Sequence, residues 1–266
     1  MKSSAIKTQN VQMSRGSLLE PRALPNMVKY FSADLDTAAS GSDVSIKDFI
    51  SGSSIAGGDS GNRGAALAAT SGPTGKRVYD FDTGVYNLGN FATQRSNFVI
   101  TMVNKVTDTT VNSEKFLLSK NVSGGFGLID FTVKYKVNID TGGSGSEDLQ
   151  AKLTATLGGA SSSPPQNTNV QRMLRNYHVM SLIQADGKMT IRFNGQQHTQ
   201  ATVSRMGNSN NLLVGDSAAD GSSNAGVFDT PEFMIYTLSD PTSFSEVIAM
   251  ENYLQKKYDI GFFPIS

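Results

Sequence analysis

Carboxylates are the side chains in this sequence that are best suited to chemistry. Asp216, Asp220 and Asp229 surround the segment GDSAADGSSN, and their oxygens are the hard ligands that Ca²⁺ prefers. Their spacing matches no known calcium loop, so calcium is a prediction from ligand chemistry alone, and no other cofactor is expected. Asp80 and Asp82 share one face of an expected strand, an arrangement that is more often structural than catalytic.

Nucleophilic chemistry is not supported. The segment GDSG (residues 58–61) resembles the nucleophile segment of trypsin-like proteases, but these need an upstream histidine, and His178 and His198 both lie downstream. Residues 215–221 resemble the serine block of GDSL-type hydrolases, which needs a later histidine, and none follows residue 198. A serine without a positioned base is not activated. The E-x-D-x-E run of strand-borne glucanase carboxylates is also absent, so we predict a non-enzymatic protein with no catalytic residue.

Composition excludes several partners. The 23 basic and 23 acidic residues give a formal net charge of zero, which does not indicate a nucleic-acid binder. No cysteine is present, so disulfides and thiolate sites are excluded. No apolar run reaches membrane-spanning length, and the first residues lack the apolar segment of a secretory signal. We therefore expect neither nucleic acid nor a membrane as a partner.

The elements that would position these side chains are mostly strands. Asp-Gly at residues 186–187 and Asn-Gly at 194–195 predict type I′ turns, and apolar residues alternate from Met189 to Phe193 between them. Residues 129–139 alternate in the same way and are expected to pair with residues 149–157. Residues 98–103 are apolar on both faces, which predicts a strand buried on both sides. One helical turn is predicted near residues 65–69.

One helix is predicted to close the chain. Its N-terminus is expected at Asp240-Pro241 or at a capping box of Ser243 and Glu246, and Gly261 is expected to end it. Helical spacing places four residues on its apolar face, namely Val247, Met250, Leu254 and Tyr258.

The C-terminal segments carry a family resemblance. Residues 233–240, within EFMIYTLSD, match a strand pattern of one known family of β domains. Residues 24–49 and 76–84 are similar to the opening strands of the same family. The closing helix matches at Glu251, Tyr253, Leu254, Lys257, Tyr258 and Ile260, with Asp259 where the family usually has Gly. Together they resemble the concanavalin A-like, laminin G-like jelly rolls of bacterial surface proteins and phage virions.

This resemblance implies an all-β, two-sheet antiparallel jelly-roll sandwich over residues 24–266, with one short C-terminal helix. Domains of this kind often bind calcium. The architecture hosts lectins, adhesins, hydrolases and inert virion modules alike, so it predicts the fold better than the activity.

Residues 1–23 are expected to form an extended N-terminal arm. Four cations, Lys2, Lys7, Arg15 and Arg22, lie along it, whereas residues 206–250 contain acidic residues but no Lys or Arg. We predict that the arm contacts this acidic side of a neighbouring subunit, a charge-complementary contact that sets register.

Two functions follow as expectations. The first is a phage virion structural protein, a capsid decoration or tail or fibre module located on the virion. Its partners would be other virion proteins, copies of itself and cell-surface glycans. The alternative is a carbohydrate-binding or adhesin module, located outside a bacterium or on its surface. The chain has no Trp, the usual platform for a sugar ring, although Tyr can substitute.

Overall fold

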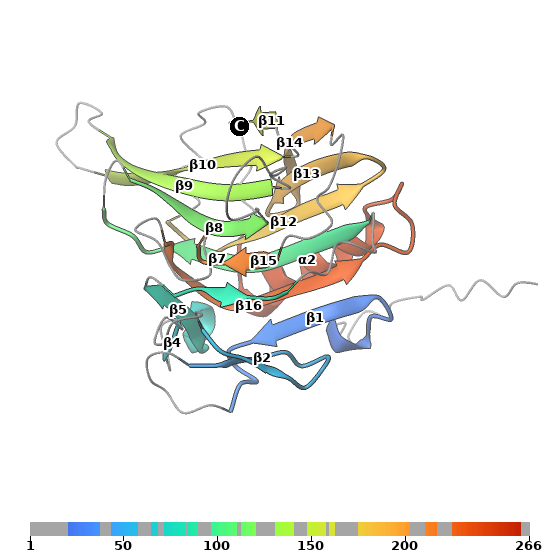
Figure 1. Ribbon diagram of the computed structural model, residues 1–266, viewed down its shortest axis with the longest axis horizontal. Helices are drawn as coiled ribbons and strands as arrows, with labels where there is room; N and C mark the ends of the chain where they lie inside the picture. The colour runs from blue at the N-terminus through green and yellow to red at the C-terminus, as the bar shows by residue number, and fades with distance from the viewer. Residues whose placement is uncertain are drawn as a thin grey trace, which may run out of the picture.

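Most of the described strands form two antiparallel sheets that pack face to face, with one helix near the C-terminus (Figure 1). The computed structural model describes residues 21–37, 44–57, 65–68, 72–82, 84–89, 97–110, 113–120, 131–140, 148–157, 160–162, 175–202, 211–216 and 225–261. The predicted all-β sandwich with a C-terminal helix is confirmed.

The larger sheet runs in the order β14 (Gln196–Thr202), β13 (Lys188–Phe193), β12 (His178–Ala185), β7 (Phe98–Val106), β16 (Val227–Thr237), β5 (Val78–Asp82) and β4 (Ala66–Ala68). Along one edge β16 has two partners. Residues 227–230 pair with β5, and residues 232–236 pair with β1 (Met27–Ser32), which lies beside β16 in Figure 1. A β-bulge interrupts the pairing of β16 with β7 between Asp229 and Glu232.

The smaller sheet has the order β11 (Ala160–Ser162), β10 (Asp148–Leu157), β9 (Phe131–Asp140), β8 (Glu114–Lys120), β15 (Leu212–Val214) and β6 (Tyr86–Asn87). Four short elements complete the described part of the chain before β5. These are η1 (Pro21–Ala23), η2 (Pro73–Gly75), and the paired strands β2 (Ile46–Lys47) and β3 (Ser54–Ile55).

Two apolar cores hold these layers. Between the sheets, stacked rings join neighbouring strands, with Phe81 and Phe228 4.4 Å apart and Phe31 and Phe233 4.3 Å apart. On the outer face of the larger sheet, the apolar side of α2 (Ser245–Tyr258) covers a second core. Because β7 lies between these two cores, both of its faces are buried, as its sequence predicts. Each fully buried apolar side chain contributes roughly 1.5–3 kcal/mol to the stability of the fold.

The local turn and pairing predictions are confirmed, with one exception. Positive φ angles at residues 186, 187, 194 and 195 give the predicted hairpin turns, because type I′ geometry needs positive φ at both central positions. In β10, Leu149 lies opposite Ile139 of β9, as the alternation predicts. The helical turn expected at residues 65–69 is wrong. Residues 66–68 form β4, which pairs with β5 as the outermost strand of the larger sheet.

Both ends of α2 differ from the prediction. Phe244 holds the N-cap position and makes no side-chain cap, while Glu246 accepts a hydrogen bond from the Ser239 backbone N–H at 3.1 Å. The helix ends at Asp259, in the left-handed conformation, and not at Gly261. Aspartate tolerates this conformation better than most residues, which allows the earlier stop. The predicted apolar face is confirmed, since all four of its residues are buried.

Candidate functional site

A pocket of about 320 Å³ opens on the outer face of the larger sheet, beside the C-terminal end of α2. Three segments that are far apart in the sequence form it: η2, the residues just before β12, and the residues that end α2. Its lining consists of Pro73, Thr74, Asn176, Tyr177, Tyr258, Asp259, Ile260 and Gly261. We call it the Tyr177 pocket.

Two residues of this lining have a strained backbone. Thr74 (φ 58) and Asp259 (φ 51) are left-handed, and for a β-branched residue such as Thr this is a genuine outlier. The other non-glycine residues with positive φ in the described chain, Asp186 and Asn194, lie in hairpin turns that require it. Such strain costs roughly 1–3 kcal/mol per residue and tends to cluster at functional sites. Its position marks the Tyr177 pocket as a candidate site.

A close backbone approach shapes the η2 wall. The Gly72 N–H donates to the Lys76 carbonyl at 2.9 Å, and a Cβ at residue 72 would lie only 2.4 Å from that carbonyl oxygen. The Thr74 hydroxyl donates to the Pro73 carbonyl at 2.6 Å. This tight turn therefore needs glycine at position 72 to place Pro73 and Thr74 at the pocket.

The Tyr177 side chain is held in place by the carboxyl group of Asp229. Its hydroxyl donates to Asp229 Oδ2 at 3.0 Å, and the Lys105 ammonium lies 5.5 Å from the ring centroid. Asp229 stands directly opposite Asp80 across β16 and β5. Burial and the Asp80 charge raise the pKa of Asp229 to about 6, while burial and the Asp82 charge raise the pKa of Asp80. Asp229 therefore keeps a proton to a higher pH than an ordinary carboxyl group.

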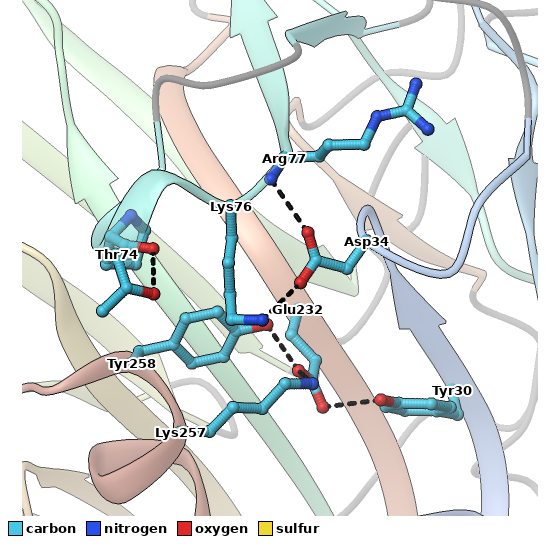
Figure 2. Close-up of polar contacts among 9 residues, drawn as sticks. Tyr30, Asp34, Thr74, Lys76, Arg77, Glu232, Lys257 and Tyr258 are labelled. Atoms are coloured by element: carbon cyan, nitrogen blue, oxygen red, sulfur yellow. Dashed lines mark hydrogen bonds and ion pairs between the residues drawn. The ribbon is translucent and has the colours of Figure 1, made fainter.

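Tyr258, on the other wall, is held in the same manner by Glu232. This fully buried carboxylate accepts hydrogen bonds from Tyr30 at 2.8 Å and Tyr258 at 2.6 Å, and pairs with the Lys257 ammonium. Figure 2 shows the two tyrosines approaching Glu232 from opposite sides. Burial, followed by the charge of Glu232, raises the pKa of both phenols. The network ties β1, β16 and α2 together at the pocket.

The resulting arrangement is suited to binding. The half-buried ring of Tyr177 contributes an apolar wall, while Asn176 and Asp259 at the exposed rim offer an amide and a carboxylate. Pro73 and Ile260 add apolar surface. A mostly apolar wall with a few polar groups that fix orientation is the usual form of a small-molecule site.

The structure describes two of the three predicted calcium ligands. Asp229 belongs to the network behind Tyr177, Asp216 is buried just after β15, and Asp220 lies outside the described residues. In the part of the chain that the structure describes, no group of three or more His, Asp or Glu residues could hold a metal ion. Calcium stays a prediction, because one of the three ligands is not placed.

Most of the predicted assembly arm also lies outside the described residues, including Lys2, Lys7 and Arg15. Arg22 is exposed in η1, next to β1. Its role in assembly therefore stays a prediction. Among the described helices, none has the length and apolar character needed to span a membrane.

Sequence reasoning missed Tyr177, Thr74 and Asn176 as site residues, since each lies in a turn or at a strand end with no motif around it. One signal was present. Asp259 stands where the resembled family usually has Gly, so this position carries a carboxylate at the end of the helix.

A second pocket, of about 420 Å³, lies beside β2 and β3. Its buried carboxylate, Asp36, already accepts hydrogen bonds from Tyr79 at 3.0 Å and from the Lys47 backbone at 3.3 Å. Because this carboxylate is engaged within the fold, we place the candidate site at the Tyr177 pocket.

Comparisons with known proteins give a likeness of fold. No family model and no curated protein matches the chain. Among solved structures, a Trypanosoma rangeli sialidase in complex with a difluoro nononic acid aligns with a TM-score of 0.58 and 13% identity, over 87% of this chain and 33% of the sialidase. Domain 4 of an extracellular arabinanase from Geobacillus stearothermophilus, in complex with arabinotriose, aligns with a TM-score of 0.50 and 12% identity, over 84% of this chain and 98% of that domain. The chain thus spans about a third of the length of the sialidase.

Proposed function

We propose that this protein is a non-catalytic carbohydrate-binding module and that the Tyr177 pocket is its sugar site. The observation that carries the proposal is the half-buried Tyr177 ring, fixed by Asp229 and bordered by the polar groups of Asn176 and Asp259. A sugar ring packs its apolar C–H face on an aromatic ring, and its hydroxyls bond to polar groups at the edge. Because the chain has no Trp, we assign the role of this aromatic ring to Tyr177.

The fold neighbours add limited support. The arabinanase domain, aligned over nearly its whole length, was solved with arabinotriose, so a sandwich of this shape accommodates an oligosaccharide. The sialidase likeness covers a third of that chain and is a likeness of fold alone. The finer family assignment, a concanavalin A-like or laminin G-like jelly roll, is part of this proposal.

The absence of catalysis is proposed because Asp259 is the one carboxylate among the described lining residues, and the two carboxylates behind the pocket walls are engaged. A typical glycosidase needs two carboxyl groups that face the scissile bond from opposite sides. Here Asp229 and Glu232 are both almost completely buried, and each accepts a hydrogen bond from a tyrosine that lines the pocket. They are engaged in positioning the rings, which leaves neither facing a bound sugar.

The setting of the module stays as the sequence predicts it, either a phage virion or a bacterial surface. The argument for a virion depends on an arm that lies largely outside the described residues. Sugar binding through the Tyr177 pocket fits both settings, because a displayed module can capture cell-surface glycans.

Glycan binding by the full chain tests the proposal. We expect Tyr177→Ala to weaken binding on a glycan array by about tenfold or more, because burial of one side chain is worth roughly 1.5–3 kcal/mol. Tyr177→Phe keeps the ring and should retain most of the binding. Tyr253→Ala, on α2 outside the lining, is the matched control and should bind as the wild type does. Binding that survives Tyr177→Ala, or a wild type that binds no glycan, refutes the proposal.

A further inference from the structure

We infer that the Tyr177 pocket selects uncharged sugars and rejects anionic ones such as sialic and uronic acids. This inference rests on the proposed sugar-binding function and adds the chemical class of the ligand. It follows from the charges at the pocket.

Among the described residues, the lining offers no cation to an anionic ligand. None of the eight lining residues that the structure describes is Lys or Arg. Recognition of a sugar carboxylate normally uses such a group, most often the bidentate fork of Arg. An anionic sugar would therefore lose its hydration at this site without gaining an ion pair.

The described cations near the pocket already have partners, including Arg175, whose guanidinium donates to the Asp108 carbonyl. Lys257 pairs with the buried Glu232, and Lys76 pairs with Asp34 at 2.8 Å (Figure 2). Lys105 lies over the Tyr177 ring and next to Asp229, its cross-strand partner on β16. To pair with a ligand, each of these lysines would have to share its ammonium group with the partner that it already contacts.

The rim carries a fixed negative charge instead. Asp259 is exposed and is the one charged residue among the described lining residues. Its backbone is held by the end of α2, where its N–H donates to the Gln255 carbonyl. Like charges at close range repel strongly where water is partly excluded. An incoming carboxylate would meet this repulsion, whereas a sugar hydroxyl can donate a hydrogen bond to the same group.

The neutral polar groups of the pocket suit hydroxyls. Asn176 provides both an amide donor and an acceptor, and Thr74, whose hydroxyl donates to the Pro73 carbonyl, keeps its oxygen as an acceptor. The volume of about 320 Å³ lies at the lower end of the range for small-molecule sites. The ligand expected here is therefore a short, uncharged sugar unit.

Matched glycan pairs provide the test. The full chain is assayed on immobilised neutral oligosaccharides, on the same oligosaccharides capped with sialic acid, and on their uronic acid counterparts. We expect the neutral member of each pair to bind at least tenfold more tightly. Asp259→Asn should reduce this preference to about threefold or less, and Asp259→Lys should reverse it. Raising the salt to about 0.5 M should also narrow the preference, since ions screen an exposed charge.

Asp186→Asn is the matched control, because Asp186 is also an exposed aspartate with positive φ but lies in a hairpin turn away from the lining. It should leave the preference unchanged. If the wild type binds acidic members as tightly as neutral ones and Tyr177→Ala abolishes both, the inference fails while the proposed sugar site stands. If Tyr177→Ala leaves all binding intact, the proposed function fails and the inference fails with it.

Discussion

Replacing Glu232 with Gln tests the network that holds the pocket walls in place. The substitution keeps the size of the side chain but removes its negative charge. In the wild type, the Glu232 carboxylate accepts hydrogen bonds from Tyr30 and Tyr258 and pairs with Lys257. We expect the free energy of unfolding to fall by about 3 kcal/mol, at the lower end of the roughly 3–5 kcal/mol for breaking a buried ion pair.

The lower end applies because the partners differ in exposure. Glu232 is fully buried, but the side chain of Lys257 is 16% exposed and can regain some hydration once its partner is neutral. The glutamine oxygen can still accept a hydrogen bond from a tyrosine, so part of the network survives. The two phenol hydrogen bonds to a charged acceptor contribute more than neutral ones, roughly 1.5–3 kcal/mol each.

Urea unfolding followed by circular dichroism measures this change. Glu114→Gln is the control, because Glu114 forms a more exposed pair with Lys134 at 3.5 Å and its side chain is 52% exposed. Exposed pairs contribute roughly 0–1 kcal/mol. A loss of about 3 kcal/mol should also lower the melting temperature by about 6 °C or more. Equal, small losses of unfolding free energy in Glu232→Gln and Glu114→Gln would refute the idea that Glu232 holds β1, β16 and α2 together.

Two further predictions concern the other pocket walls. The folded-state pKa of Asp229, about 6, lies above its ordinary 3.8, so its stabilising contribution is complete below about pH 4 and is lost as the pH rises through 6. Asp229→Asn should therefore gain stability relative to the wild type from pH 4 to 7 in urea titrations, and parallel pH profiles would contradict this. Gly72→Ala should cost roughly 1–3 kcal/mol, because the new Cβ lies 2.4 Å from the Lys76 carbonyl oxygen. Gly261→Ala, with open space around its Cβ, should cost much less, and equal losses would contradict the close-approach argument.

Local chemistry explains the parts of the fold that the sequence predicts well. The turns at 186–187 and 194–195 depend on two adjacent residues each, and the strict alternation in β9 assigns every side chain to a face. The apolar face of α2 follows from spacing alone. These features need no knowledge of distant segments, so composition and period suffice to predict them.

Tertiary contacts determine the features that the sequence does not predict. Residues 66–68 have a helix-like composition of Ala and Leu, yet they form β4 because they pair with β5 at the edge of the sheet. The Tyr177 pocket needs η2, the start of β12 and the end of α2 to meet, which no local pattern specifies. The sequence predicts Asp229 as a calcium ligand from its neighbours along the chain, whereas its partners in space are Tyr177 and Asp80.

The bulge in β16 shows most directly why the site could not be predicted. Side chains three residues apart in a regular strand point to opposite faces, so Asp229 and Glu232 would be assigned to different layers. In the structure Asp229 lies opposite Lys105 and Glu232 opposite Val103, a step of three residues against two, so both reach the outer face. Within the bulge, Pro231 has no N–H to donate, and the Thr230 hydroxyl donates to the Val103 carbonyl at 2.7 Å instead. This one extra residue lets a single strand hold Tyr177 and Tyr258, two walls of the same pocket.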